Sequence, residues 1–288
     1  MSWVTIDQEK CNECGLCVLR CASCFSKENE TITANADIEC CNLCGHCVSL
    51  CPTDAIVHEK MNMENFIAVD RGIDIDTDTF IKFVRKRRSQ RHFKDKEIPR
   101  KDIEKLIDVC RYAPTGANLQ GVEVMVIQNQ EKVKELSSLT VDFFNILGTS
   151  AEKQLGELTS EEKTSKKAEL LQRTARYKER LTLAREVGYD PIFHKAPAVI
   201  IFHTHLQAGS AKDDCVIAST TMGLTAMTMG LGTTYIGLFE AAAKNHPPVN
   251  DALNLPPEHG VFSVLIIGYP KLKYQRTVDR KQIKTTWV

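Results

Sequence analysis

The chain has 288 residues, and its 37 lysines and arginines balance its 37 aspartates and glutamates, so the formal net charge is zero. A balanced charge provides no global field for nucleic acid or an anionic membrane, and the sequence has no apolar run long enough to span a bilayer. The length predicts about two domains, and the first residues lack the basic start and apolar core of a signal peptide, so we expect a cytoplasmic protein.

Twelve cysteines are present, and eight of them form an internal repeat near the N-terminus. Each half reads C-x2-C-x2-C-x3-C, and the second half follows the first by 30 positions. Thiolates two residues apart can turn inward onto one iron–sulfur cluster, and Gly15 and Gly45 let the backbone pass close to it. The fourth cysteine of each half ligates the other cluster. The predicted ligand sets are therefore Cys11, Cys14, Cys17 and Cys51 for one [4Fe–4S] cluster, and Cys41, Cys44, Cys47 and Cys21 for the second.

On this repeat, about the first 60 residues resemble the bacterial two-cluster ferredoxins. One departure is Ala22 after Cys21, where proline is usual, with Cys24 three residues on as an alternative ligand to Cys21. Zinc ribbons use paired C-x2-C knuckles rather than triplets. Disulfides are not expected in a chain without an export signal, so Cys24 and Cys40 are predicted to be spare thiols.

Short strands are predicted at residues 3–6, 31–33 and 54–58, with short helices after each cluster-binding glycine. We take residues 1–60 as a ferredoxin domain, 61–78 as a linker, and 79–288 as a second domain. A helix is predicted to begin near Thr79, with Phe80 and Val84 facing inward.

A basic run follows, in which six of the ten residues 82–91 are lysine or arginine. A solvated face or a nucleic-acid patch would account for the charge, but neither accounts for Ser89 within it. A serine hydroxyl flanked by arginine forks suits a phosphate group.

The middle of the chain alternates helices and strands. Residues 99–112 carry apolar side chains at helical spacing and stop before Pro114. A loop with two amide side chains, Asn118 and Gln120, precedes a buried strand at 122–127. Such amides cap loops or recognise a ring edge with donors and acceptors. Residues 131–147 are predicted to be helical, and 150–189 form either a solvated helix or a lid.

The C-terminal part begins with a buried strand at 196–203. His203 and His205 share one strand face at a spacing that can bind metal, but no acidic or thiolate partner lies nearby in sequence, so an ordinary histidine pair is favoured. A helix at 213–229 and strands at 233–237 and 261–268 follow. The basic tail, residues 271–288, has no core of its own and is expected to lie against another surface.

Residues 79–276 resemble the nitroreductase family of FMN-dependent oxidoreductases. Four motifs carry the resemblance in order: R-R-S-x-R-x-F at 87–93, the N-x-Q of the amide loop, G-L-G-T at 230–233 with Ile236 and Gly237, and G-Y-P at 268–270 with Arg276 beyond. The family often has proline and an aromatic after N-x-Q, where this chain has Gly121 and Val122.

The resemblance implies an α+β sandwich, mainly an antiparallel sheet flanked by helices, that forms a homodimer with FMN at its interface. It assigns Arg87, Ser89 and Arg91, helped by Arg88, to the FMN phosphate and the pyrimidine side of the flavin. Asn118 would bond the isoalloxazine edge, Ile236 and Gly237 would present backbone near N5, and Arg276 or Lys273 would return to the phosphate. It names no catalytic acid, because the chemistry runs through the flavin.

Together, the ferredoxin-like region and the nitroreductase-like region predict an enzyme that passes electrons from a low-potential donor, such as reduced ferredoxin, through two clusters to FMN and on to a small organic substrate. Nitro compounds, quinones and similar molecules fit this class. One alternative runs the other way, with NAD(P)H reducing FMN and the clusters delivering electrons to an acceptor protein. A second alternative is a redox sensor or electron carrier without a turnover substrate.

Overall fold

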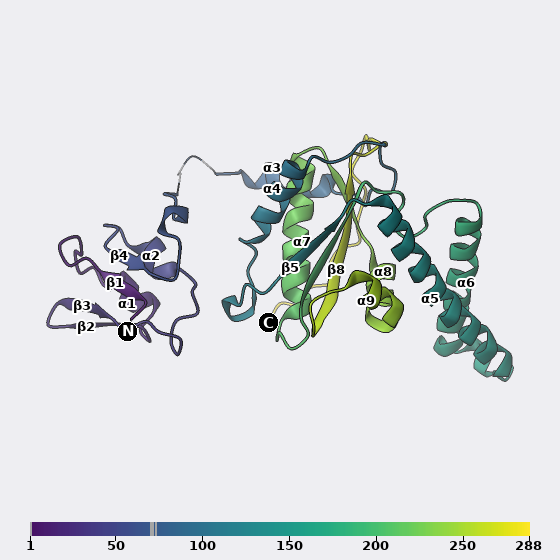
Figure 1. The fold of residues 1–288 in the computed structure, drawn as a ribbon, viewed down its shortest axis with the longest axis horizontal. Helices are drawn as coiled ribbons and strands as arrows, with labels where there is room; N and C mark the ends of the chain where they lie inside the picture. The colour runs from purple at the N-terminus through teal and green to yellow at the C-terminus, as the bar shows by residue number, and fades with distance from the viewer. Residues whose placement is uncertain (1, 70–71, 73) are drawn as a thin grey trace. The chain divides into compact units, whose positions relative to one another are not determined.

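The computed structural model describes residues 2–69, 72 and 74–288. By its internal contacts the chain divides into two compact units (Figure 1). One comprises Met1–Ile75 with Ala117–Leu119, and the other comprises Asp76–Gly116 with Gln120–Val288. Asp70, Arg71 and Ile73, which belong to the predicted linker, lie outside the described residues.

The N-terminal unit is built from two small antiparallel pairs and two short helices. β1 (Val4–Ile6) pairs with β4 (Ile56–His58), and β2 (Phe25–Glu28) pairs with β3 (Thr31–Ala34). The helices α1 (Leu16–Arg20) and α2 (His46–Leu50) occupy equivalent places in the two halves of the repeat. Strands and helices predicted here are confirmed, and β2 is an addition.

A glycine precedes each of these short helices for a conformational reason. Gly15 and Gly45 have φ of 76° and 69°, in the left-handed region that costs other residues free energy. The chain can therefore turn sharply after the second cysteine of each triplet, just before the helix that carries the third. A small core then closes the unit, and its buried members are Val4, Cys17, Cys24, Phe25, Ile32, Ala36, Val48 and Ile56.

The second unit is organised by a four-stranded antiparallel sheet in the order β5-β6-β8-β7. Its strands are β5 (Glu123–Ile127), β6 (Ala198–His205), β7 (Gly232–Tyr235) and β8 (His259–Gly268). β6 and β8 are almost wholly buried, which explains their near-continuous apolar sequences. The predicted α+β sandwich is confirmed for this unit.

Helices cover both faces of the sheet (Figure 1). On one face, α5 (Gln130–Glu157), α8 (Gly237–Asn245) and α9 (Pro247–Leu253) pack against Val199 and Ile201 of β6. On the other, α4 (Arg100–Cys110) and α7 (Ala211–Thr228) pack against Ile200 and Phe202. Alternate residues of β6 therefore serve two separate cores.

Three sequence predictions need correction. Helix α5 runs to Glu157, ten residues beyond its predicted end at 147, because α6 (Lys166–Glu186) packs along it and buries Leu181 (Figure 1). Strand β7 ends at Tyr235 rather than at Gly237, where α8 begins. Short 3₁₀ turns also occur among the described residues: η1 (Met63–Asn65) lies in the N-terminal unit, η3 (Glu162–Thr164) lies in the second unit, and η2 (Gly116–Asn118) has its first residue in the second unit and its other two in the N-terminal unit.

The third correction concerns α3 (Thr77–Lys86), which Asp76 caps through its carboxylate. Phe80 and Val84 were expected to face a core, but they are 47% and 40% exposed, and no residue of the helix is buried. Helix α3 is amphipathic by sequence, and its apolar face is exposed to solvent in the single chain.

Candidate functional site

The basic run lies along the edge strand of the sheet in the second unit. Helix α3 ends at Lys86, and Ser89 forms a parallel bridge with Thr233 of β7. The Gln90 N–H donates to the Thr233 carbonyl at 3.1 Å, and the Thr234 hydroxyl donates to the Gln90 carbonyl. A Cβ at Gly232 would clash with the Gln90 side chain, so glycine permits this close pairing. The run is thereby fixed beside the strand that leads to Ile236 and Gly237.

Arg88 has a buried polar atom without a partner. Its Nε has no hydrogen-bond partner within the described part of the chain, and its guanidinium carbon lies 5.8 Å from the Tyr274 ring centroid. A buried donor left unsatisfied costs about 1–3 kcal/mol. An anionic oxygen at this position would remove that cost, so the donor set of the run fits a phosphate group.

Arg91 lies on another side of the run, beside a tyrosine–histidine pair. The Tyr189 hydroxyl lies 2.7 Å from Nδ1 of His194. Burial lowers the pKa of His194; the negative charge of Asp190 opposes this shift, and the positive charge of Arg91 adds to it. Sequence reasoning did not single out Tyr189 or His194, because they belong to the turn after α6 and carry no motif.

The remaining predicted flavin contacts have these positions. Ile236 is buried and its N–H donates to the Val264 carbonyl at 2.9 Å, while Gly237 is exposed at the start of α8. Arg276 is exposed and lines a cavity of about 570 Å³ together with Lys86, Gln90 and Tyr274. The tail therefore lies beside Lys86 and Gln90 of the basic run, and a contact of Arg276 with a phosphate stays a prediction.

Asn118 differs from the others in its surroundings. It ends η2 with φ of 58°, a conformation that asparagine tolerates better than most residues. Contacts group Ala117–Leu119 with the N-terminal unit, whereas Arg87, Arg88, Ser89, Arg91, Ile236, Gly237 and Arg276 belong to the second unit.

In the N-terminal unit, four predicted ligands line one small cavity. These are Cys11, Cys14, Cys17 and Cys51. Burial raises the pKa of Cys17, and the neighbouring charges of Cys11 and Cys14 raise it further. Burial of Cys51 is outweighed by hydrogen bonds, including one from the Ala55 N–H to Sγ at 3.2 Å, so the pKa of Cys51 is lowered. The fourth thiol of this group comes from the second half of the repeat.

The other predicted ligand set is also brought together. Burial raises the pKa of Cys47 to about 11, with smaller contributions from the charges of Cys44, Cys41 and Cys21. Cys21 belongs to the first half of the repeat, yet its charge raises the pKa of Cys47 in the second half. Both groups offer four sulfur donors, the set that a [4Fe–4S] cluster requires.

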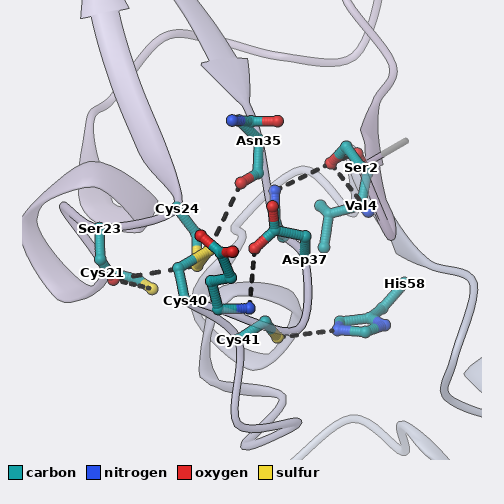
Figure 2. The surroundings of a disulfide bond; sticks show 12 residues. Ser2, Val4, Cys21, Ser23, Cys24, Asn35, Asp37, Cys40, Cys41 and His58 are labelled. Carbon is teal, nitrogen blue, oxygen red and sulfur yellow. Dashed lines mark hydrogen bonds between the residues drawn. A yellow bond between two sulfur atoms is a disulfide. The ribbon is translucent and has the colours of Figure 1, made fainter.

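Cys24 and Cys40, predicted to be spare thiols, form a disulfide (Figure 2). This corrects the expectation that no disulfide would form. The hairpin of β2 and β3 carries the chain back on itself, so that the two Cα atoms lie 5.9 Å apart despite a separation of 16 residues. As a disulfide partner, Cys24 does not serve as the alternative ligand to Cys21.

Among the helices of the described residues, none combines the length and the apolar character that crossing a membrane requires.

Comparison with known proteins gives a consistent picture for the second unit. The model of the nitroreductase family matches residues 84–269, about two thirds of the chain. A protein of Archaeoglobus fulgidus, whose name proposes NADH dehydrogenase or NAD(P)H nitroreductase activity, is 24% identical over 191 residues, which cover 66% of this chain and 85% of that protein.

Two solved structures share the fold. A nitroreductase with bound FMN from Desulfitobacterium hafniense has a TM-score of 0.52 and 21% identity, over 72% of this chain and 97% of its own. A nitroreductase with bound FMN from Bacteroides fragilis has a TM-score of 0.50 at the same identity and the same coverage.

Proposed function

The chain belongs to the nitroreductase family and is an FMN-dependent oxidoreductase, and from this premise we propose that two [4Fe–4S] clusters in its N-terminal unit supply electrons to the flavin. The proposal divides the chain into a ferredoxin domain at residues 1–60, a linker at 61–78, and a flavin domain at 79–288. It makes a small organic molecule, such as a nitro compound or a quinone, the final electron acceptor.

The observation that carries the flavin assignment is the buried Nε of Arg88, which has no hydrogen-bond partner among the described residues and belongs to a run of arginines fixed beside β7. Arg87, Arg88 and Ser89 would hold the phosphate, and Arg276 approaches from the tail. Arg91, Asn118, Ile236 and Gly237 would contact the flavin itself. The exposed start of α8 at Gly237 leaves backbone N–H groups free of intrahelical partners, which suits an acceptor atom on a ring.

Support for the clusters comes from the two sulfur groups. The cavity of Cys11, Cys14, Cys17 and Cys51 and the mutual influence of Cys21, Cys41, Cys44 and Cys47 match the crossed ligation predicted from the repeat. Backbone donors such as the Ala55 N–H would stabilise the anionic sulfurs. Bound clusters transfer single electrons, and FMN exchanges electrons singly or as a hydride, so together they can convert one type of transfer into the other.

The expected assembly is a homodimer in the cytoplasm. The apolar side chains of α3 and the tail residues Ile283 and Trp287, which are 90% and 92% exposed, would be covered by a second copy of the chain.

An anaerobic reduction experiment tests the direction of electron flow. The holoprotein is mixed with reduced ferredoxin, or separately with NADH or NADPH, and the flavin absorbance is followed. The proposal expects bleaching with reduced ferredoxin and little with the nicotinamides alone. Bleaching by reduced ferredoxin that persists in a variant without clusters would contradict the proposal.

A second candidate is favoured by the name of the Archaeoglobus relative, which includes NAD(P)H. In this case NAD(P)H reduces FMN, and the clusters pass electrons to an acceptor protein. Rapid bleaching by NADH or NADPH alone, followed by reduction of the clusters, would select it over the first candidate.

A further inference from the structure

Three side chains from three neighbouring strands meet at one end of the sheet in the second unit. Glu123 begins β5, His203 lies near the end of β6, and His259 begins β8. Glu123 is directly opposite His203, and His259 is directly opposite His205. An irregularity in the register between Phe202 and His203 shifts the pairing of β6 with β8.

The three residues share the face of the sheet that packs against α5 and α8. His203 continues the alternation of Val199 and Ile201, which belong to the core on that face. Glu123 likewise continues the alternation of Met125 and Ile127. The polar end of this face therefore adjoins a large apolar core, and His203 is only 4% exposed.

The distances suit one shared cation. Nδ1 of His203 lies 3.1 Å from Nδ1 of His259, and one possible ligand atom from each of the three residues lies within 4.8 Å of the others. Two imidazole nitrogens bound about 2.0–2.1 Å from a tetrahedral zinc ion would be separated by roughly 3.3 Å. The two rings therefore need little movement, and the half-exposed Glu123, whose Oε1 is 4.0 Å from Nε2 of His259, has room to approach.

A hydrogen bond between the two rings is the simpler explanation of the 3.1 Å contact. It would need one ring to donate through Nδ1 and the other to accept. This bond accounts for the contact between the two histidines, but Oε1 of Glu123 lies 4.0 Å from Nε2 of His259, which is too far for a hydrogen bond, so the bond alone does not account for the position of the carboxylate. Two imidazoles and one carboxylate form the protein ligand set of several catalytic zinc sites, in which the fourth position holds water or substrate.

We propose that Glu123, His203 and His259 form a site for a divalent transition metal ion, with Zn²⁺ as the probe. His205 stands outside the ligand set although it shares the strand face. Its Nδ1 accepts from the Gln207 N–H at 3.2 Å, so Nε2 carries the proton and donates to Glu258 at 3.1 Å. Both ring nitrogens of His205 are occupied, which makes it a matched control.

The test measures zinc and iron together in the full-length holoprotein. Protein equilibrated with Zn²⁺ and dialysed is analysed by inductively coupled plasma mass spectrometry, for the wild type and for His203→Gln, His259→Gln, Glu123→Gln and His205→Gln. The wild type and His205→Gln should hold about one zinc ion per chain more than the two other histidine variants. Glu123→Gln should weaken zinc binding about tenfold or more, since even residues that only orient ligands contribute that much.

Equal iron contents would show that the zinc difference does not come from cysteines that have lost their clusters. Zinc should also raise the melting temperature of the wild type but not that of His259→Gln. If His203→Gln fails to fold, the zinc contents of His259→Gln and of Glu123→Gln, a substitution at a half-exposed position, still test the proposed site. Equal zinc content in the wild type and these variants, or an equal loss in His205→Gln, would overturn the proposal.

Discussion

The two units of this chain achieve a folded state by different means. In the N-terminal unit, the described residues form a small apolar cluster that already includes two buried cysteines, and further cysteines are half-buried around it. The second unit has two apolar cores, one on each face of its sheet, with fully buried residues such as Leu136, Phe202 and Phe239. Small domains bury too little apolar surface to be stable alone, and disulfides or metal clusters bound by cysteines add the missing stability. We therefore expect cysteine substitutions to affect the N-terminal unit and leave the second unit unchanged, and core substitutions in the second unit to do the reverse.

The largest expected effect is that of removing two of the proposed cluster ligands. A Cys14→Ser/Cys44→Ser double variant should lose iron and all turnover driven by reduced ferredoxin, because each cluster loses one sulfur ligand. FMN content and the melting temperature of the second unit should be unchanged. Iron analysis, flavin absorbance and calorimetry measure the three quantities. Ser49→Ala, at an exposed position of α2, is the control, and ferredoxin-driven turnover at the wild-type rate in the double variant would refute the electron path.

A core substitution should show the opposite pattern. Leu136→Ala removes a side chain that is fully buried in the core of α5 and should lower the free energy of unfolding of the second unit by about 2–5 kcal/mol. Iron content should remain that of the wild type. Denaturant unfolding followed by FMN release measures the loss, and Leu183→Ala, at a position of α6 that is 59% exposed, should change it little. Cluster loss at the same denaturant concentration as FMN release would show that the units unfold together.

The disulfide should matter to the N-terminal unit alone. Closing a loop of about 15 residues contributes roughly 3 kcal/mol in the chain-entropy model, so Cys24→Ser/Cys40→Ser should lower that unit's stability by about this amount. The visible absorbance of the clusters during thermal unfolding reports the change. A thiol reductant should destabilise the wild type to the level of the variant and leave the variant as it is. No response of the wild type to the reductant would mean that the disulfide contributes nothing.

The sequence predicted most of what depends on spacing along the chain. The cysteine repeat predicted two sets of four thiols, which remain proposed cluster ligands, and the apolar runs of β6 and β8 predicted the positions of the central strands to within a few residues. Helix α5 was predicted too short because its last turns are packed by α6, a partner that residues 131–147 do not reveal.

Features that join distant segments were not predictable in this way. The disulfide depends on a hairpin that returns Cys40 to Cys24, and nothing in their spacing distinguishes them from spare thiols. Likewise, His203 was judged to lack an acidic partner because Glu123 is 80 residues earlier in the chain, although the pairing of β5 with β6 places the two opposite one another. The sheet register, which is a long-range property, supplied the missing partners.

Substitution of Arg88 is expected to have the smallest effect, and it distinguishes FMN binding from folding stability within the second unit. Arg88→Met removes a buried donor that has no partner within the part of the chain that the structure describes, so the apoprotein should be as stable as the wild type or slightly more stable. FMN binding should weaken by about 1.5–3 kcal/mol, or roughly tenfold to a hundredfold in Kd, because a hydrogen bond to a charged group is lost. Fluorescence titration of apoprotein with FMN measures Kd, and Arg85→Met on the exposed face of α3 is the matched control for charge. If Arg88→Met bound FMN as the wild type does while losing stability, the side chain would be a packing element of the sheet edge, and the phosphate would have to be held by the remaining arginines.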